Sequence, residues 1–315
     1  VFCGVVVCGK LTMLEHIVDA FPHTSVTGAF AYGSGIFSQA NADKNDLPQL
    51  DFMFIVDDAK EWHARNMELH PQHYSMLKLL GPAGVEWVQR NGGGKAYFNT
   101  STKVLGCESM IKYGVISTQD LVEDLDHWSM LYISGRLHKP VKFLKNPTPE
   151  VSLALDQNLR HAMNTALFIL PEKFSAVDLF TTISAISYTG DVRMGIAENP
   201  DKVSNIVVAN MEHFHRLYEQ FIPLDGSKAN QGEVVKIGYN MYEQDTNPEV
   251  KEKLWQSLPL GDSRGQMSVN GLNQILRAKI ALTSREQTIK GFFTAGPKKA
   301  ILYGLRKVSK RFLRR

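Results

Sequence analysis

Cysteine is scarce in this chain of 315 residues, and long apolar runs are absent. Cys3, Cys8 and Cys107 cannot all pair with one another and lack metal-ligand spacing, so we expect a reducing compartment and no zinc site. The opening VFCGVVVCGK is shorter than the roughly 18 apolar residues that span a bilayer, and it predicts a first β-strand. Val1 is not an initiator methionine, which is compatible with removal of a leader segment.

Two common ligand-binding motifs are also missing. NGGGKAYF lacks the spacing of a phosphate-binding P-loop, and neither Ser nor Thr follows Lys95, so we expect a hairpin or a mobile loop there. HARNMELHPQHY carries three histidines at irregular spacing, which does not favour metal ligation.

Positive charge is concentrated at the C-terminus. The formal net charge is +3, but residues 298–315 carry eight Lys or Arg and no acid. Residues 1–297 therefore have 27 basic and 32 acidic side chains, a formal charge of −5. On a helix, the apolar residues of the tail form one stripe and the basic residues fill the opposite face, the pattern of a helix that lies on anionic lipid.

The first half of the chain alternates strand-like and helix-like segments. Four short apolar runs with Gly-rich turns predict strands: VTGAFAYGSG, LDFMFIV, KAYFN and IKYGVIS. The clearest helix begins with Thr118 as the predicted N-cap and ends before Gly135. This alternation predicts an α/β or α+β domain.

The second half is predicted to be mainly helical. Helical patterns occupy 151–220, including one long segment that begins near Pro200, and another helix follows from Val269. Residues 221–265 are polar and turn-rich, which indicates a loop region. We place three units at 1–148, 149–297 and 298–315.

One turn and one aspartate indicate phosphate chemistry. In YGSGIFSQ, Gly33 and Gly35 allow close backbone approach, and Ser34 adds a hydroxyl where a helix start would favour an anion. Polymerase-β-type nucleotidyltransferases share a Gly-Ser turn followed by a strand aspartate that holds Mg²⁺, a position that Asp51 matches. Met53 stands where that superfamily usually has a second acid, and Glu108 is our candidate for the missing carboxylate.

A second cluster is basic. SGRLHKPVKFLK contains Arg136, Lys139, Lys142 and Lys145, and Lys112 and Tyr113 lie together in IKYG. Solvated lysines beside a turn are the simpler interpretation, but a reaction that joins two phosphates needs positioned cations. A phosphate acceptor is already an anion at neutral pH, so no general base is required.

Together, an ordered set of segments resembles one family from about residue 28 to 296: AYGSGIF, LDFMFIVDD, HPQHYSMLK, KYGVIS, GRLHKPVK, SYTGDVRM, NPDKVSNIV and TSREQTIKGFFTAG. They look like the mitochondrial translocator assembly and maintenance proteins, which are phosphatidate cytidylyltransferases. The resemblance implies CTP and phosphatidic acid as substrates, CDP-diacylglycerol and pyrophosphate as products, Mg²⁺ as cofactor, and a place on the path to cardiolipin. It also implies a nucleotidyltransferase domain followed by a winged-helix-like domain.

The resemblance assigns roles by position. Gly33, Ser34 and Gly35 would hold the CTP phosphates and Asp51 the metal, with Glu108 as our added metal ligand. The residues that would face phosphates or nucleotide are Lys112, Tyr113, Arg136, Lys139 and Lys142, with Asp51, Ser34 and Lys112 as the catalytic set.

A peripheral location on the matrix side of the mitochondrial inner membrane is also implied. The tail residues expected to touch an anionic membrane are Leu302, Leu305, Lys307, Lys310 and Phe312. Arg285 and Lys290 are further candidates for capture of the lipid phosphate.

Two alternatives remain open from the residues. One is a nucleotidyltransferase that acts on RNA, although basic residues confined to a short amphipathic end and no evident stacking module argue against nucleic acid. The other is a non-catalytic scaffold that supports assembly of a membrane complex, for which Met53 is the best argument. The oligomeric state is not predicted.

Overall fold

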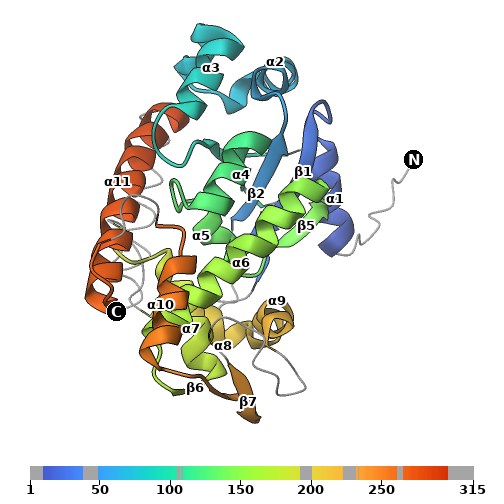
Figure 1. Cartoon of the computed structure of the whole chain (residues 1–315). Coiled ribbons are helices and arrows are strands. Elements are labelled where there is room, and N and C mark those ends of the chain that lie inside the picture. The colour runs from blue at the N-terminus through green and yellow to red at the C-terminus, as the bar shows by residue number, and fades with distance from the viewer. Residues whose placement is uncertain are drawn as a thin grey trace.

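A computed structural model shows a mixed α/β protein (Figure 1). The structure describes residues 10–37, 49–104, 107, 109–191, 201–222, 232, 234–260 and 265–296. Within these ranges, no helix combines the length and apolar character needed to cross a membrane.

The first part of the chain is built around a five-stranded mixed sheet with the order β3-β4-β2-β1-β5. β2 runs parallel to β4, and the other neighbouring pairs are antiparallel. The strands are β1 (Val26–Tyr32), β2 (Leu50–Val56), β3 (Tyr97–Thr102), β4 (Ile111–Ser117) and β5 (Lys142–Lys145). Each of the four strands predicted between residues 26 and 117 is confirmed.

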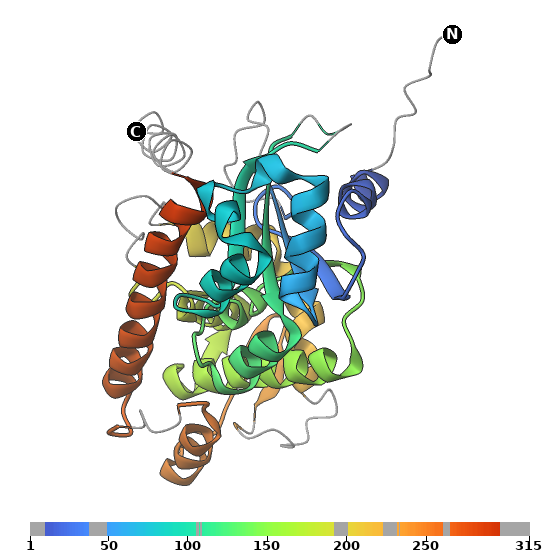
Figure 2. The same ribbon diagram turned by 90° about the horizontal axis from the view of Figure 1, so that it is seen from above.

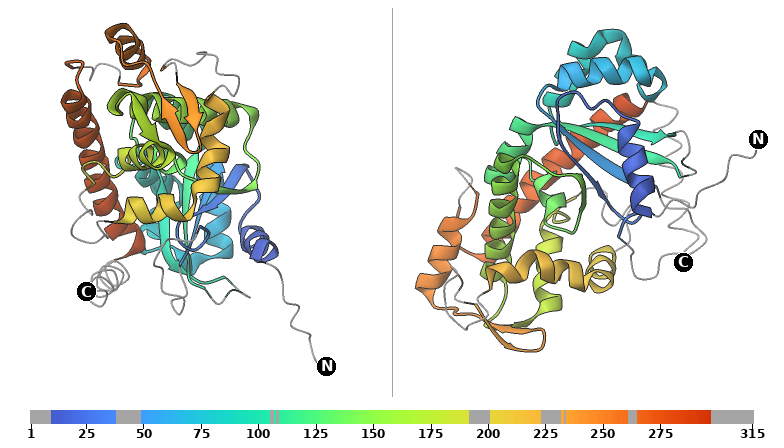
Figure 3. Two further views of the ribbon diagram at one scale, coloured as in Figure 1. Left: turned by 90° about the horizontal axis from the view of Figure 1, so that it is seen from below. Right: turned by 90° about the vertical axis from the view of Figure 1, so that its right-hand side faces the viewer.

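Helices cover both faces of this sheet, because alternate side chains of its central strands are apolar on each side (Figures 1 and 3). Leu14 of α1 (Lys10–Asp19) and Trp62 of α2 (Ala59–Leu69) pack on one face. Leu121 of α4 (Thr118–His127), Leu137 of α5 (Ser134–Leu137) and Val151 of α6 (Pro149–Ile169) pack on the other. Between α2 and β3 lie η1 (Pro71–His73), η2 (Met76–Leu80) and α3 (Gly81–Arg90).

A second core gathers the C-terminal helices around the later turns of α6. A small sheet of order β6-β8-β7 lies at its edge (Figure 3). Its elements are β6 (Lys173–Ser175), α7 (Ala176–Ile186), α8 (Lys202–Ala209), α9 (Met211–Tyr218), η3 (Glu219–Phe221), β7 (Val235–Gly238), β8 (Met241–Glu243) and α10 (Pro248–Ser257). The domain boundary near residue 148 stays a prediction.

One long helix, α11 (Val269–Ala295), contacts both parts of the molecule. Leu272, Leu276 and Ile280 lie in the second core. Near its other end, Gln287 accepts a hydrogen bond from the Gly94 amide at 3.0 Å, beside β3. The polar TSREQ segment therefore fastens α11 to the glycine-rich loop before β3.

Three local predictions are wrong. The helix after β4 has Ser117, not Thr118, as its N-cap, because the Ser117 side chain accepts a hydrogen bond from the Asp120 amide. It ends at His127, where Trp128 adopts a left-handed conformation, and Gly135 lies inside α5. The long helix predicted from Pro200 is divided at Asn210 into α8 and α9, and 221–265 contains β7, β8 and α10 rather than a loop alone.

Candidate active site

The predicted metal ligand lies in a row of side chains across three neighbouring strands. Asp51 is the second residue of β2; it pairs with Tyr32 at the end of β1 and with Lys112 on β4. Asp51 precedes Met53 and Ile55 on the same side of the strand, which is the sheet face packed against α4 and α5. Aspartate, tyrosine and lysine therefore meet at one end of that face.

The predicted phosphate turn lies directly against this carboxylate. Gly33 has a φ of +81°, and a Cβ at this position would lie 2.9 Å from Asp51 Oδ2. A Cβ on Gly35 would lie 2.7 Å from the Gln49 carbonyl oxygen. Both glycines are thus required by close approach, at Gly33 together with a backbone conformation that L side chains rarely adopt. Ser34, between them, is exposed.

Two cations stand beside the row on aromatic faces. The Arg136 guanidinium carbon lies 4.3 Å from the centre of the Tyr32 ring, and Lys112 Nζ lies 4.6 Å from that of Phe98. Burial works to lower the pKa of Arg136, but neighbouring groups that include Tyr32 and Asp51 outweigh it and raise that pKa. The arginine is a permanent positive charge next to Asp51.

The backbone before Arg136 is shaped by one buried carboxylate. Asp124 Oδ1 accepts hydrogen bonds from the amides of Met130 and Leu131 at 2.9 and 2.7 Å. Its Oδ2 accepts from three consecutive amides, those of residues 132 to 134, at 3.3, 3.0 and 2.9 Å. Five amides converging on Asp124 hold the chain that leads into α5, and α5 carries Arg136.

A small pocket adjoins Arg136 on the side of α7 and α11. Its polar lining includes Lys139, Ser187, Asp191 and Thr283, beside Arg136. Lys139 Nζ donates to Ser187 Oγ at 2.7 Å and to the Gly135 carbonyl. Burial, with the positive charges of Arg136 and Lys202, lowers the pKa of Lys139 well below its usual value. A cation that is costly to bury becomes favourable when an anion enters the pocket.

Other residues predicted for the site lie elsewhere. Tyr113 is fully buried on the opposite face of the sheet, where its hydroxyl accepts from the side-chain amides of Asn66 and Asn99 at 2.8 Å each. Lys142 pairs with Ala31 and precedes Phe143, which packs on the Asp51 face, so Lys142 belongs to the other side of β5. We therefore carry neither residue into the site.

Two further basic candidates have structural contacts. Lys145 donates to the Val26 carbonyl. Lys290 is buried and donates to the Gln89 carbonyl at 2.8 Å, so it fastens α11 to α3. Glu108 and all five predicted membrane residues of the tail lie outside the described residues.

The donor atoms near Asp51 suit a metal that arrives with its nucleotide. Met53 is fully buried: a Cβ on Gly114 would meet its Cε at 2.7 Å. In the part of the chain that the structure describes, no three His, Cys, Asp or Glu side chains form a metal cluster. Mg²⁺ is commonly bound by one or two carboxylates together with substrate phosphates. Asp51 beside a glycine turn fits that mode.

Some of the site was not predicted from sequence. Tyr32 and the Ser187–Tyr188 pair were missed, although AYGSG and SYTGDVRM contain them. Asp124 was not singled out in the sequence, and only the chain reversal after His127 brings the five amides to it. An acid a few residues before a helix end was the available signal, and it is a weak one.

Comparison with known proteins then identifies the family. The family model described as mitochondrial phosphatidate cytidylyltransferase matches residues 14–270. The chain belongs to this family. The relatives named "Phosphatidate cytidylyltransferase, mitochondrial" include those of Xenopus laevis and Mus musculus, each 40% identical, covering 96% and 94% of this chain and 95% and 94% of their own. The Caenorhabditis elegans protein of that name is 33% identical over 94% of this chain and 97% of its own.

Membership confirms the resemblance found in the sequence. Both GSG and Asp51 lie within the matched range, as do Lys112, Arg136 and Lys139. The match ends at residue 270, so most of α11 and the tail lie beyond it.

Proposed function

We propose that this protein transfers CMP from CTP to phosphatidate, which yields CDP-diacylglycerol and pyrophosphate. A phosphate oxygen of phosphatidate bonds to the α-phosphorus of CTP, and the bond from that phosphorus to the β-phosphate bridging oxygen breaks. The observation that carries the proposal is family membership over most of the chain. The geometry supports it, because a glycine turn, a carboxylate and two cations meet at one end of the sheet.

The residues divide the work as follows. The backbone of Gly33, Ser34 and Gly35 holds the triphosphate beside Asp51, since the two glycines let this turn pack directly against Asp51 and the Gln49 carbonyl. Lys112 and Arg136 offset the repulsion between two phosphate groups as they approach. The acceptor is already ionised, so no residue has to remove a proton from it.

Magnesium enters this proposal with the nucleotide. Asp51 would hold it, with phosphate oxygens and Glu108 as further ligands. When bound, Mg²⁺ neutralises charge on the attacked phosphate and on the leaving pyrophosphate.

We assign the pocket beside Arg136 to the second anionic group of the reaction. Lys139 and the hydroxyls of Ser187 and Thr283 line it, which suits a phosphate. A buried lysine with a lowered pKa gains stability as its ammonium form when a phosphate is present, so substrate binding is favoured there.

The architecture and location follow the same proposal. We infer a polymerase-β-type nucleotidyltransferase domain in the first part, a winged-helix-like domain in the second, and a basic membrane-associating helix at 298–315. The relatives are named mitochondrial, which supports a mitochondrial location. We infer a peripheral position on the matrix side of the inner membrane, on the path to cardiolipin.

The deciding experiment measures pyrophosphate release from CTP and Mg²⁺ with and without phosphatidate in liposomes. Asp51→Asn should lower turnover roughly 100-fold or more while leaving the fold intact, because several kcal/mol of charge stabilisation are lost and each 1.36 kcal/mol is about tenfold. Asp156→Asn, an exposed acid on α6, is the matched control and should retain full activity.

The buried Met53 gives a scaffold function its one supporting observation. No release from folded protein with any divalent metal would refute the enzyme proposal and favour that scaffold. Equal phosphatidate-dependent release from wild type and Asp51→Asn would leave the enzyme standing and refute the role of Asp51. Release that required RNA instead of phosphatidate would refute the lipid acceptor.

A further inference from the structure

Large apolar side chains are exposed together where η2 and α3 meet the C-terminal end of α11. Figure 2 shows the red end of α11 beside the segment that contains η2 and α3. We call these side chains the η2–α11 surface, and their exposed fractions are Met76 79%, Leu79 75%, Leu80 60%, Trp87 66%, Ile289 62% and Phe293 58%. A monomeric protein rarely leaves such a group without a partner.

Specific contacts join the two sides of this surface. Ser75 Oγ donates to the Phe293 carbonyl at 2.8 Å, which places η2 next to the last turns of α11. Trp87, Val88 and Ile289 line the same shallow hollow. The surface is therefore continuous across segments about 200 residues apart in the chain.

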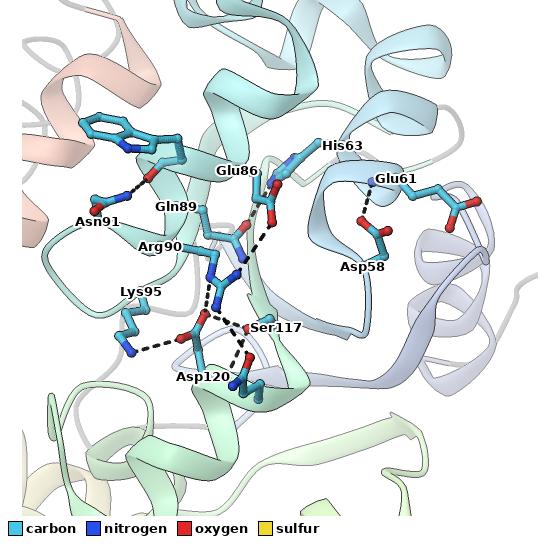
Figure 4. Close-up of polar contacts among 12 residues, drawn as sticks. Asp58, Glu61, His63, Glu86, Gln89, Arg90, Asn91, Lys95, Ser117 and Asp120 are labelled. Atoms are coloured by element: carbon cyan, nitrogen blue, oxygen red, sulfur yellow. Dashed lines mark hydrogen bonds and ion pairs between the residues drawn. The ribbon is translucent and has the colours of Figure 1, made fainter.

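Buried polar contacts keep Trp87 turned outward. On the inner side of α3, Gln89 Oε1 accepts from His63 Nε2 at 2.9 Å (Figure 4). At the end of α3, Arg90 Nε lies 3.5 Å from the buried carboxylate of Asp120, which also binds Lys95 (Figure 4). Rotating α3 to bury Trp87 would break these bonds, so its exposure is a property of the fold.

The position of the C-terminus argues for a membrane as the occupant. α11 ends at this surface, because Gly296 lies against Ser75. The eight Lys and Arg of 298–315 follow at once, with no acid among them. Trp, Leu and Phe beside basic residues are typical of surfaces that enter the headgroup region of anionic bilayers.

We propose that the η2–α11 surface inserts into the interfacial region of an anionic bilayer, as a contact separate from the basic tail. The inference rests on the proposed function in one respect, since a lipid substrate gives the enzyme a reason to sit on a membrane. The tail then supplies charge attraction, and the η2–α11 surface supplies apolar insertion and fixes the orientation.

Trp87 provides a direct probe of this insertion. The chain has four tryptophans, and Trp62, Trp128 and Trp255 are each at most 5% exposed. Vesicles of phosphatidylcholine and phosphatidylglycerol with brominated acyl chains should therefore quench mainly Trp87. Trp87→Phe should remove most of that quenching, while leaving vesicle binding within about twofold of wild type because Phe is also apolar.

Vesicle flotation tests the energetic role. A Leu79→Ser/Leu80→Ser variant should bind these vesicles about tenfold more weakly or worse, because two exposed leucines lose their apolar contact with lipid. Leu153→Ser is the matched control: Leu153 is 72% exposed on α6, away from this surface, and its variant should bind like wild type.

Several results would overturn the proposal. One is vesicle binding without quenching of Trp87, which would leave the tail as the sole anchor. Another is burial of Trp87 that grows with protein concentration and needs no lipid, which would make the occupant a second copy. A third is a Trp87 that becomes exposed only after removal of 298–315, which would make the tail itself the occupant of this surface.

Activity on detergent-dispersed phosphatidate separates this proposal from the proposed function. Quenching of Trp87 without any CTP-dependent turnover would refute the function and leave the membrane surface standing. Normal turnover in detergent with no Trp87 quenching on vesicles would refute the membrane surface and leave the proposed function standing.

Discussion

Replacing Asp124 by Asn tests whether one carboxylate organises the approach to Arg136. Asp124 is 2% exposed and accepts five amide hydrogen bonds, two on Oδ1 and three on Oδ2. An asparagine is nearly identical in shape but carries one NH₂ group, which must face one of these two sets of N–H donors. At least two backbone amides then lose their acceptor.

The magnitude follows from the number of amides left unpaired. Each buried donor without a partner costs about 1–3 kcal/mol, so Asp124→Asn should lower the free energy of unfolding by about 2–6 kcal/mol. That is a large share of the 5–15 kcal/mol typical of a domain, and urea unfolding at pH 7 measures it directly. Turnover should fall as well, because the backbone that carries Arg136 shifts.

Glu123→Gln provides the control for Asp124→Asn. Glu123 is the preceding residue on α4 and is exposed, 3.7 Å from the imidazole of His127, and such pairs contribute little. Its variant should unfold within about 0.5 kcal/mol of wild type. If Asp124→Asn unfolds at the same urea concentration as Glu123→Gln and keeps its turnover, Asp124 does not organise the backbone that leads to Arg136.

Two further predictions concern the glycine turn and acid stability. Gly33→Ala forces a φ near +81° on an alanine, which costs about 1–2 kcal/mol of conformational free energy. Its Cβ would also lie 2.9 Å from Asp51 Oδ2, so CTP turnover should fall at least about tenfold. Gly291→Ala, whose Cβ would meet nothing within 4 Å, should keep full activity, and equal activity of both variants would contradict the cradle. Burial lowers the pKa of His63 to about 4 and that of His138 to about 3. In the unfolded chain both histidines have a pKa of about 6.5, so below that pH the unfolded chain binds more protons than the folded one. The free energy of unfolding should therefore fall as the pH drops from about 7 to 5, by about 2 kcal/mol for each histidine, in urea titrations. His138→Gln should show a shallower pH dependence than wild type, and an unchanged one would exclude His138 as a source.

The strands were predictable because their patterns are local. LDFMFIV and IKYGVIS are short β-rich runs bounded by turn residues, and they form β2 and β4. The helix ends were less predictable than the strands. Ser117 and Thr118 are both good N-caps, and only the direction of the chain leaving β4 selects Ser117. The divided helix at Asn210 depends on contacts with α6 and α7, and β7 and β8 depend on pairing with the distant β6, neither of which periodicity reports.

The candidate site shows the same division. The glycine turn and the strand that carries Asp51 follow one another along the chain, so a turn-and-strand motif predicts that Gly33 lies against Asp51. Lys112 could be placed beside Asp51 only when the parallel register of β2 and β4 was known. Tyr113 is the neighbour of Lys112 on β4, and adjacent residues of a strand point to opposite faces of the sheet. A role for both Lys112 and Tyr113 at one ligand was therefore inconsistent with the prediction that IKYG is a strand.

Met53 has a structural explanation that bears on the metal site. Its side chain fills the space over Gly114, where an added Cβ would also lie 2.6 Å from Phe98 Cε1, so the pair forms part of the packing between the sheet and α4. An aspartate here would place an unpaired charge in that core, at a cost that proteins seldom accept. Because position 53 serves the core, a second carboxylate in the proposed Mg²⁺ site would come from another position, and Glu108 is our candidate. The protein then contributes few fixed ligands, and the phosphate oxygens of CTP complete the shell in the proposed reaction. Metal and nucleotide binding would be coupled in such a site, so in the proposed reaction Asp51 and the turn at Gly33 would act as a single functional unit.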